Sequence, residues 1–343
     1  MSWAERYRIA AVVPCHNEEA AVAKVVTDLR AAVPGMAVYV YDNASTDLTV
    51  ERALEAGAVV CSEPLKGKGN VVRRAFADID ADVYLLIDGD DTYDAAAAPE
   101  MIERLVTDNL DQVVGVRRGS AYRTGHQLGN QVLNRIVCAI FGDTMGDMLS
   151  GYRVFSRRFV KSFPAVSREF EIETELTVHA LALRIPSATV DVDFTDRAEG
   201  SESKLRTYRD GWKILNVILT LTRHERPIHF FGWFSILLAF VATGLATPVL
   251  VTYLHTGMVP RLPTLFVASF LGLMACVLFV AGIVIDGTRK ARHETSRLAY
   301  MRHPAVRGTY VHDPAYYEDV SFHGDRQGDA AAPVTAVPAP RAG

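Results

Sequence analysis

The sequence predicts an α/β protein with a mostly parallel sheet sandwiched by helices, followed by an interfacial amphipathic helix and a two-helix transmembrane hairpin. Short apolar runs alternate with helical patterns over the first ~190 residues, which is typical of a parallel sheet covered on both faces. Two uncharged apolar runs of 24 residues follow at 230–253 and 262–285. As helices they are about 36 Å long, against about 30 Å for the hydrocarbon core of a bilayer. Two buried core helices are the alternative interpretation of these runs.

The predicted strands and helices alternate in order. Asn17 is expected to cap the first helix, and Gly57 is expected to end the second. Sheets of this kind bind ligands at the carboxyl ends of their strands, so the polar residues that follow the strands can share one crevice. The strands are expected at 8–14, 36–42, 58–63, 83–88 and 112–117, and the helices at 18 to about 32, 45–57, about 70–77 and 99–109.

The fourth strand runs into the acidic sequence DGDDTYD, at residues 88–94. Gly89 allows a sharp turn, so that Asp88 and Asp90 can point to one place. Clustered carboxylates repel one another unless a cation neutralises them, and hard oxygen ligands suit Mg²⁺ or Mn²⁺. Mg²⁺ usually takes its remaining ligands from phosphate and water, so this pattern indicates a metal that holds a diphosphate. A surface Asp-Gly turn is the alternative.

Two other strand ends favour the diphosphate. DNASTD follows the second strand at 42–47, and LKGKGN follows the third at 65–70. Glycines in the latter permit close backbone approach, and its lysines can meet phosphate charge. Neither GxxxxGK[ST] nor GxGxxG is present, so a nucleotide would be held differently from that of an ATPase or a dehydrogenase.

VVPCHNEE, VYDNASTD, LKGKGN and LIDGDDTY, in this order and spacing, resemble the nucleotide-sugar-binding half of family 2 glycosyltransferases with the GT-A fold. The later stretches GVRRGSAYR, GDMLSGYRVFSRR and RAEGSESKL, followed by an interface helix and a membrane hairpin, are similar to polyprenyl-phosphate glycosyltransferases. That group contains dolichol-phosphate mannose synthases and undecaprenyl-phosphate glucosyltransferases. The resemblance covers roughly residues 8–285, and the ordered set of motifs carries it rather than any single one.

The resemblance implies an inverting transfer of a single hexose from a UDP- or GDP-sugar to a polyprenyl (undecaprenyl or dolichyl) phosphate, with Mg²⁺ or Mn²⁺. Asp90, Asp147 and Arg117 would be the catalytic residues. The chain has DGDDTYD where the family often has a D-A-D-L-Q type motif, which leaves open whether Asp90 or Asp91 is the second metal contact. The implied donor-binding residues are Pro14, His16, Asn17, Glu18, Asp42, Lys68 and Asp88, the metal ligands are Asp88 and Asp90, and the acceptor-phosphate residues are Arg117, Arg123, Arg197 and Lys204.

A polyprenyl phosphate is already an anionic nucleophile at neutral pH, because the second pKa of a phosphate monoester is about 6. A strong general base is then not obligatory, and Asp147 is expected to orient the acceptor or the sugar; a helix or turn cap is its alternative role. Transfer to a hydroxyl of a lipid or glycan would require a true base. A non-catalytic membrane adaptor with the same fold is the third hypothesis. Arg157 and Arg158 are expected to be solvated or lipid-facing.

The charge pattern predicts the topology. Basic residues flank the two apolar runs on their outer sides, whereas the loop between them offers only Arg261, so both termini are expected to be cytoplasmic and the protein multi-pass in the cell membrane. A formal charge of −4 gives no reason to expect a nucleic-acid partner, and the layout leaves a homo-oligomer open. The expected parts are a catalytic domain (1–203), an interfacial helix (204–229), two transmembrane helices (230–285), a cytoplasmic tail (286–323) and a disordered Ala/Pro-rich end (324–343).

Overall fold

A computed structural model describes residues 6–118, 147–165, 172–195, 223 and 226–306. Within these residues a seven-stranded sheet has the order β3-β2-β1-β4-β6-β5-β7. Every neighbouring pair is parallel except those of β6, which runs antiparallel to β4 and β5. The mostly parallel sheet is therefore confirmed. The strands are β1 (Ile9–Cys15), β2 (Ala37–Asp42), β3 (Val59–Ser62), β4 (Val83–Leu86), β5 (Gln112–Arg118), β6 (Arg153–Ser156) and β7 (Ser187–Asp193).

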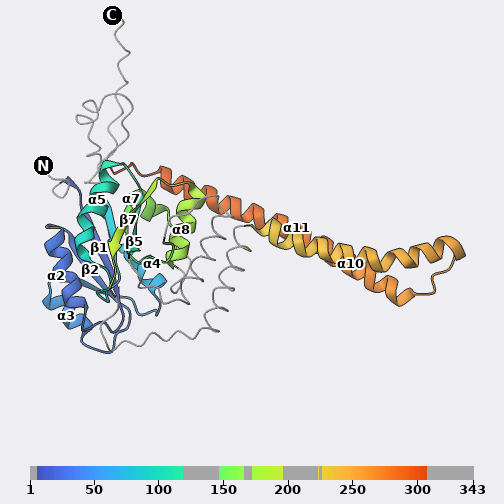
Figure 1. Ribbon diagram of the computed structural model, residues 1–343, viewed down its shortest axis with the longest axis horizontal. Helices are drawn as coiled ribbons and strands as arrows, with labels where there is room; N and C mark the ends of the chain where they lie inside the picture. Colours follow the sequence, from blue (N-terminus) through green and yellow to red (C-terminus); the bar gives the residue numbers. More distant parts are fainter. Residues whose placement is uncertain (1–5, 119–146, 166–171, 196–222, 224–225, 307–343) are drawn as a thin grey trace, which may run out of the picture.

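Helices cover both faces of the sheet, with α2, α3 and α5 on one side and α4, α7 and α8 on the other (Figure 1). Strand β1 shows why both faces are covered: Ile9, Ala11 and Val13 point into one apolar cluster, whereas Ala10 and Val12 point into the other. The helices are α2 (Val22–Ala32), α3 (Thr49–Glu55), α4 (Lys68–Asp78), the 3-10 turn η1 (Ala95–Ala97), α5 (Ala98–Thr107), α7 (Arg157–Ser162) and α8 (Ile172–Leu183).

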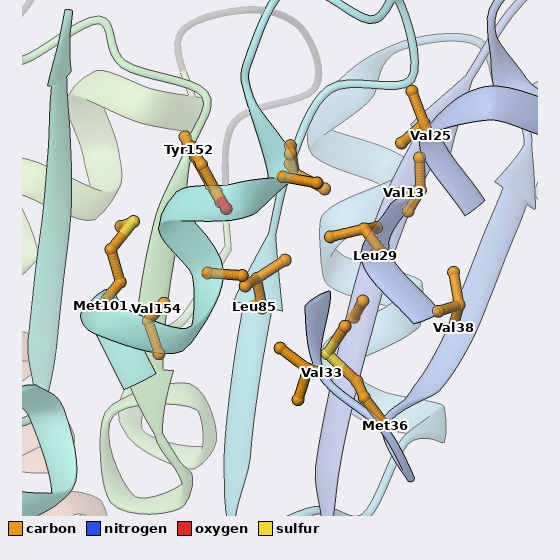
Figure 2. Packing of buried hydrophobic residues seen from close by; sticks show 14 of the residues in the cluster. Val13, Val25, Leu29, Val33, Met36, Val38, Leu85, Met101, Tyr152 and Val154 are labelled. Atoms are coloured by element: carbon orange, nitrogen blue, oxygen red, sulfur yellow. The ribbon is translucent and has the colours of Figure 1, made fainter. Parts of the chain in front are cut away.

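The larger apolar cluster joins the two halves of the sheet. Figure 2 shows Val13 of β1 and Leu29 of α2 on one side of it, and Leu85 of β4 in the middle. Met101 of α5 and Val154 of β6 continue the cluster toward the antiparallel strand. All five side chains are buried. This continuous packing fixes the strands whose ends carry the polar sequences.

The first helix begins later than the sequence predicts, because Asn17 is not its cap. Helix α2 starts at Val22, and Asn17 has a left-handed backbone with φ of 58°. The side-chain oxygen of Asn17 instead accepts a hydrogen bond from the backbone N–H of Thr46, at 2.8 Å. Asparagine tolerates this conformation better than most residues, so it serves a tight loop here rather than a helix start.

Two long helices follow the sheet, α10 (Pro227–Thr256) and α11 (Leu262–Met301), and they pack side by side as a hairpin (Figure 1). Of the described residues, these helices alone are long and apolar enough to cross a membrane, and in each only 17% of the most apolar window is buried. Trp233 is 73% exposed and Phe240 is 78% exposed. Core helices of a soluble domain would be mostly buried, so that alternative does not describe them.

Helix α11 continues beyond its apolar part and returns to the sheet, where it lies against α7 and α8 (Figure 1). At its end the Tyr300 hydroxyl donates a hydrogen bond to Asp111, at 2.6 Å. Arg158 donates two more to the same carboxylate, at 2.5 and 2.6 Å, and its guanidinium lies 4.7 Å from the centre of the Tyr300 ring. The expectation that Arg158 is solvated or lipid-facing is wrong, because the fully buried Asp111 holds it.

The sheet directions place this contact away from the polar strand ends. Strand β6 is antiparallel to both β4 and β5, so β4 and β5 run the same way. Asp111 precedes β5 and therefore lies at the opposite edge of the sheet from Asp88, which follows β4. Residues 286–301, predicted as the start of a tail, are thus a helical connection between the hairpin and the far edge of the sheet.

Candidate active site

The predicted donor residues lie at one edge of the sheet. Strand β1 has β2 on one side and β4 on the other, all parallel, with Cys15 directly opposite Asp42. Pro14 and Glu18 are half-buried and His16 is exposed. The chain thus brings the ends of three neighbouring strands to a common edge, as the sequence pattern indicates.

The loops after β1 and β2 are tied together by hydrogen bonds. The Glu18 backbone N–H donates to the Thr49 hydroxyl at 2.9 Å, and the Asn17 N–H donates to the Ser45 hydroxyl at 3.0 Å. The buried Asp42 carboxylate accepts from the Ser45 N–H at 3.2 Å, which closes a turn. Asn17 and Asp42 therefore shape this edge besides facing it.

Asn43, which sequence reasoning did not single out, holds the third loop. Its buried amide donates to the backbone carbonyls of Glu63 and Leu65, both at 2.8 Å, and accepts from the Gly67 N–H at 2.7 Å. Gly67 has φ of 125°, which side chains rarely permit, and it directly precedes α4. Lys68 consequently becomes the first residue of α4 and enters the site from a fixed position.

Lys68 forms the centre of a charged triad with Asp88 and Glu173. Its ammonium nitrogen lies 2.5 Å from Asp88 Oδ1 and 2.5 Å from Glu173 Oε1. The Lys68 and Glu173 side chains are 9% and 6% exposed, whereas that of Asp88 is 29% exposed. Burial acts to lower the pKa of Lys68, but the attraction of Asp88 and Glu173 outweighs it and raises that pKa above its ordinary value. Lys68 is therefore a buried cation at neutral pH.

Two glycines make room for the end of β4. A Cβ on Gly151 would overlap the Asp88 carboxylate, and one on Gly89 would overlap the Cys15 sulfur. The Gly151 backbone N–H also donates to the Tyr93 hydroxyl, at 3.0 Å. Hence the loop before β6 is packed directly onto the Asp88 side chain, a contact that only the folded chain reveals.

The carboxylates of Asp90 and Asp91 are engaged differently. Asp90 accepts from the Thr92 hydroxyl at 2.6 Å, whereas Asp91 has φ of 56° and is paired with Lys24 of α2 at 2.7 Å. Both carboxylates therefore already have a partner, and the choice between Asp90 and Asp91 as the second metal contact stays a prediction. In the described part of the chain, no group of three or more His, Cys, Asp or Glu side chains is arranged to hold a metal ion. Two carboxylates would leave the other positions to diphosphate and water, an arrangement that suits Mg²⁺.

Asp147 and Arg117 form a bidentate ion pair. The guanidinium donates to the two carboxylate oxygens at 2.5 and 3.0 Å, and it lies 5.3 Å from the centre of the Phe194 ring. Asp147 is 3% exposed, and its carboxylate also accepts from the Leu149 N–H at 3.2 Å. Asp147 thus caps the turn before β6, the alternative role considered from the sequence, and it also orients Arg117. Its expected role of orienting the acceptor or the sugar stays a prediction.

Arg153 is a fully buried residue whose part sequence reasoning missed. It donates to the backbone carbonyls of Ser150 and Met148, at 2.9 and 2.7 Å, and to the Thr177 hydroxyl at 2.9 Å. Burial lowers the pKa of Arg153 to about 10, although the charges of Glu173 and Asp147 act in the opposite direction. It stays protonated at pH 7 and fastens the loop before β6 to helix α8.

Three of the predicted acceptor-phosphate residues, Arg123, Arg197 and Lys204, lie outside the described residues, as do most of the predicted interfacial helix and the predicted disordered end. Arg117, at the end of β5, is the fourth, and the structure places it with Asp147 near the polar edge.

The chain combines a mostly parallel α/β domain, with polar side chains gathered at its strand ends, and an apolar helical hairpin. Residues 10–161 match the model of "Glycosyl transferase family 2". Glycosyltransferase AglJ of Haloferax volcanii is 36% identical over 251 residues, 71% of this chain and 81% of the relative. The chain belongs to glycosyltransferase family 2.

Two further comparisons agree with this assignment. A "Dolichyl-phosphate hexose transferase" of Haloferax volcanii is 28% identical over 221 residues, 64% of this chain and 95% of the relative. Glucosyl-3-phosphoglycerate synthase of Mycobacterium tuberculosis, solved with Mg²⁺ and uridine diphosphate, is a structural neighbour with a TM-score of 0.54 and 25% identity, covering 64% of this chain and 80% of that one. The GT-A fold predicted from the motifs is confirmed.

Proposed function

We propose that this glycosyltransferase is an inverting, membrane-bound enzyme that moves one hexose from a UDP- or GDP-sugar to a polyprenyl phosphate. The observation that carries the proposal is the combination of a carboxylate edge suited to a nucleoside diphosphate with an exposed apolar hairpin on the same chain. The similar dolichyl-phosphate hexose transferase, by its name, acts on a lipid phosphate of this class.

Donor binding is assigned to the edge formed by β1, β2 and β4. The structural neighbours that hold uridine diphosphate with Mg²⁺ or Mn²⁺ support a divalent cation here, with Asp88 and Asp90 as its protein ligands. The cation would stabilise negative charge on the leaving diphosphate. Lys68 supplies a fixed positive charge beside Asp88, where that charge develops. The nucleoside is assigned to Pro14, His16, Asn17, Glu18 and Asp42, which lie at the same edge.

Acceptor binding is assigned to Arg117, together with Arg123, Arg197 and Lys204. The guanidinium of Arg117 is held by Asp147 through two hydrogen bonds, so it is already oriented before a phosphate arrives. Because both oxygens of Asp147 accept from that guanidinium, this carboxylate is poorly placed to remove a proton. This arrangement supports an acceptor that is already an anion over a hydroxyl acceptor that needs a base.

The hairpin is assigned to the membrane. The lipid tail of a polyprenyl phosphate cannot leave the bilayer, so the enzyme must work where the phosphate emerges. Arg289, Lys290 and Arg292 follow the second apolar run, and Arg261 lies in the loop between the runs. By the positive-inside rule this pattern supports a cytoplasmic catalytic domain, residues 1–203, at the cell membrane.

A transfer assay with membranes that contain the full chain tests the proposal. The membranes are incubated with labelled UDP- and GDP-hexoses and with Mg²⁺ or Mn²⁺. Label is expected to enter an organic-soluble, mild-acid-labile lipid with one donor, and Asp88→Asn is expected to abolish this. Asp78→Asn, which alters an exposed carboxylate on α4, is the matched control and should leave transfer intact. Label that stays in the aqueous phase with every donor would contradict the proposal.

A further inference from the structure

The triad of Lys68, Asp88 and Glu173 has two carboxylates and one ammonium, and only Asp88 is partly exposed. We propose that Lys68 is an internal counter-ion that occupies Asp88 until a nucleoside diphosphate arrives, and that Glu173 is the positioning residue that retains Lys68 when Asp88 turns to the metal. The inference rests on the proposed function, since it takes Asp88 as a metal ligand. It adds a prediction about binding: without the diphosphate the protein binds the metal weakly, and with the diphosphate it binds the metal strongly.

The contacts give the first step. The Lys68 ammonium nitrogen lies 2.5 Å from Asp88 Oδ1. It therefore occupies the position close to this oxygen that a coordinated metal ion would need. The other oxygen, Oδ2, faces Gly151, where a Cβ would overlap it. A cation that approaches Asp88 therefore meets an ammonium ion on one oxygen and the packed backbone beside the other. Repulsion between Lys68 and a divalent ion makes metal binding to the triad alone unfavourable.

The difference in burial gives the second step. The Asp88 side chain is 29% exposed at the polar edge, whereas Glu173 is 6% exposed in the first turn of α8. Asp88 can meet a ligand from outside, but Glu173 has only the inside of the protein to face. Glu173 keeps a carboxylate beside Lys68 in either state, so that this buried lysine is never left without a negative partner.

The third step concerns how Glu173 is held in place. Its backbone carbonyl accepts a hydrogen bond from the Thr177 hydroxyl at 3.0 Å, and that hydroxyl accepts one from Arg153 at 2.9 Å. Arg153 in turn is bonded to the loop that packs Gly151 onto Asp88. The buried Arg153 therefore links the turn of α8 that carries Glu173 to the loop that packs on Asp88. The Lys68 ammonium lies between the two carboxylates and contacts both.

A diphosphate changes the balance, because it brings negative charge to the open side of the triad. Lys68, which follows Gly67 as the first residue of α4, can then donate to a phosphate oxygen while its contact with Glu173 persists. Asp88 is released from the ammonium and becomes available to the metal. Metal and diphosphate should hence bind cooperatively, with the coupling passing through Lys68.

The test measures Mn²⁺ binding by electron paramagnetic resonance on the full chain in detergent, with and without uridine diphosphate. The wild type should bind Mn²⁺ at least about tenfold more tightly when the nucleotide is present. Lys68→Met should tighten binding of Mn²⁺ alone by about tenfold and reduce the effect of the nucleotide by a similar factor. Glu173→Gln should weaken Mn²⁺ binding in the presence of the nucleotide, because Asp88 is then the only carboxylate left to pair with Lys68.

Two further variants make the result decisive. Lys68→Met combined with Glu173→Gln removes a positive and a negative charge together, so it avoids an unpaired buried carboxylate; its Mn²⁺ binding should match that of Lys68→Met. Glu175→Gln, two residues along α8, is the matched control and should behave as wild type. Unchanged binding of Mn²⁺ alone in both Lys68 variants overturns the inference.

Asp88→Asn separates this inference from the proposed function. If Asp88→Asn keeps wild-type Mn²⁺ binding with the nucleotide, then the metal site itself is misplaced and the proposed function fails with it. If Asp88→Asn loses that binding while the Lys68 variants bind Mn²⁺ as the wild type does, then only the counter-ion role fails.

Discussion

Replacing Asp111 by asparagine probes the contact that joins helix α11 to the far edge of the sheet. Asp111 is fully buried and accepts hydrogen bonds from the hydroxyls of Ser156 and Tyr300 and from Nε and Nη2 of Arg158. Asparagine has nearly the same shape but no charge, so it leaves the Arg158 guanidinium without its counter-ion. Removing one partner of a buried pair costs about 3–5 kcal/mol in the free energy of unfolding. For a domain of this size the melting temperature should fall by about 6–20 °C.

Thermal unfolding of the full chain in detergent, followed by circular dichroism, measures this shift. Asp108→Asn is the control, because Asp108 lies three residues away and makes an exposed ion pair with Arg104 at 3.6 Å. Such a pair contributes about 0–1 kcal/mol, so the control should melt within about 4 °C of the wild type. Tyr300→Phe loses one neutral donor to the same carboxylate and should fall between the two. Equal melting temperatures for Asp111→Asn and Asp108→Asn would refute the importance of this buried contact.

Three further outcomes are expected. Gly151→Ala should lower the free energy of unfolding by about 1 kcal/mol or less, because the Asp88 carboxylate that it displaces is the end of a side chain. It should nevertheless weaken Mn²⁺ binding in the presence of uridine diphosphate about tenfold, and wild-type affinity in Gly151→Ala would contradict the packing argument. Gly244→Ala, which is in open space, is the control and should change neither quantity. Asp147→Asn should lower turnover about 10–100-fold, because it releases Arg117, while the shape of the pH–rate profile should stay the same. Loss of one limb of that profile would instead show that Asp147 is a general base. Burial lowers the pKa of His179 to about 4, with a smaller contribution from a neighbouring histidine. Below pH 6.5 the unfolded chain therefore binds a proton that the folded chain does not, and the free energy of unfolding should fall by about 3 kcal/mol between pH 6.5 and 4. His179→Phe should flatten this part of the stability–pH curve, and an unchanged slope would exclude His179 as its cause.

The strand ends could be predicted because local sequence dictates them. An apolar run that stops at Ile87 and continues as Asp88 and Asp90 marks both the strand and its ligand-binding end. The parallel order of β1, β2 and β4 then follows from the intervening helices, and it brings Asp42 opposite Cys15. The location of the polar residues at this edge is confirmed, whereas the role of each side chain stays a prediction.

The remaining features depend on contacts between distant parts of the chain. Glu173 lies 105 residues from Lys68, in a helix whose sequence shows no polar motif, so its pairing is not visible locally. Strand β6 has only four residues, and its antiparallel direction depends on its neighbours. Arg158 resembles a surface arginine until the fold brings Asp111 and Tyr300 to it.

Helix α11 also has a mechanical consequence. From Asp286 to Met301 it is continuous, and each residue adds about 1.5 Å and about 100° of rotation. One end of this rod is fitted against α10, where Gly282 packs on Phe231, and the other is fixed by Tyr300. An insertion or deletion of a single residue between them would turn Tyr300 away from Asp111 while the hairpin stayed in place. The length of this segment is therefore constrained by the contacts at its two ends.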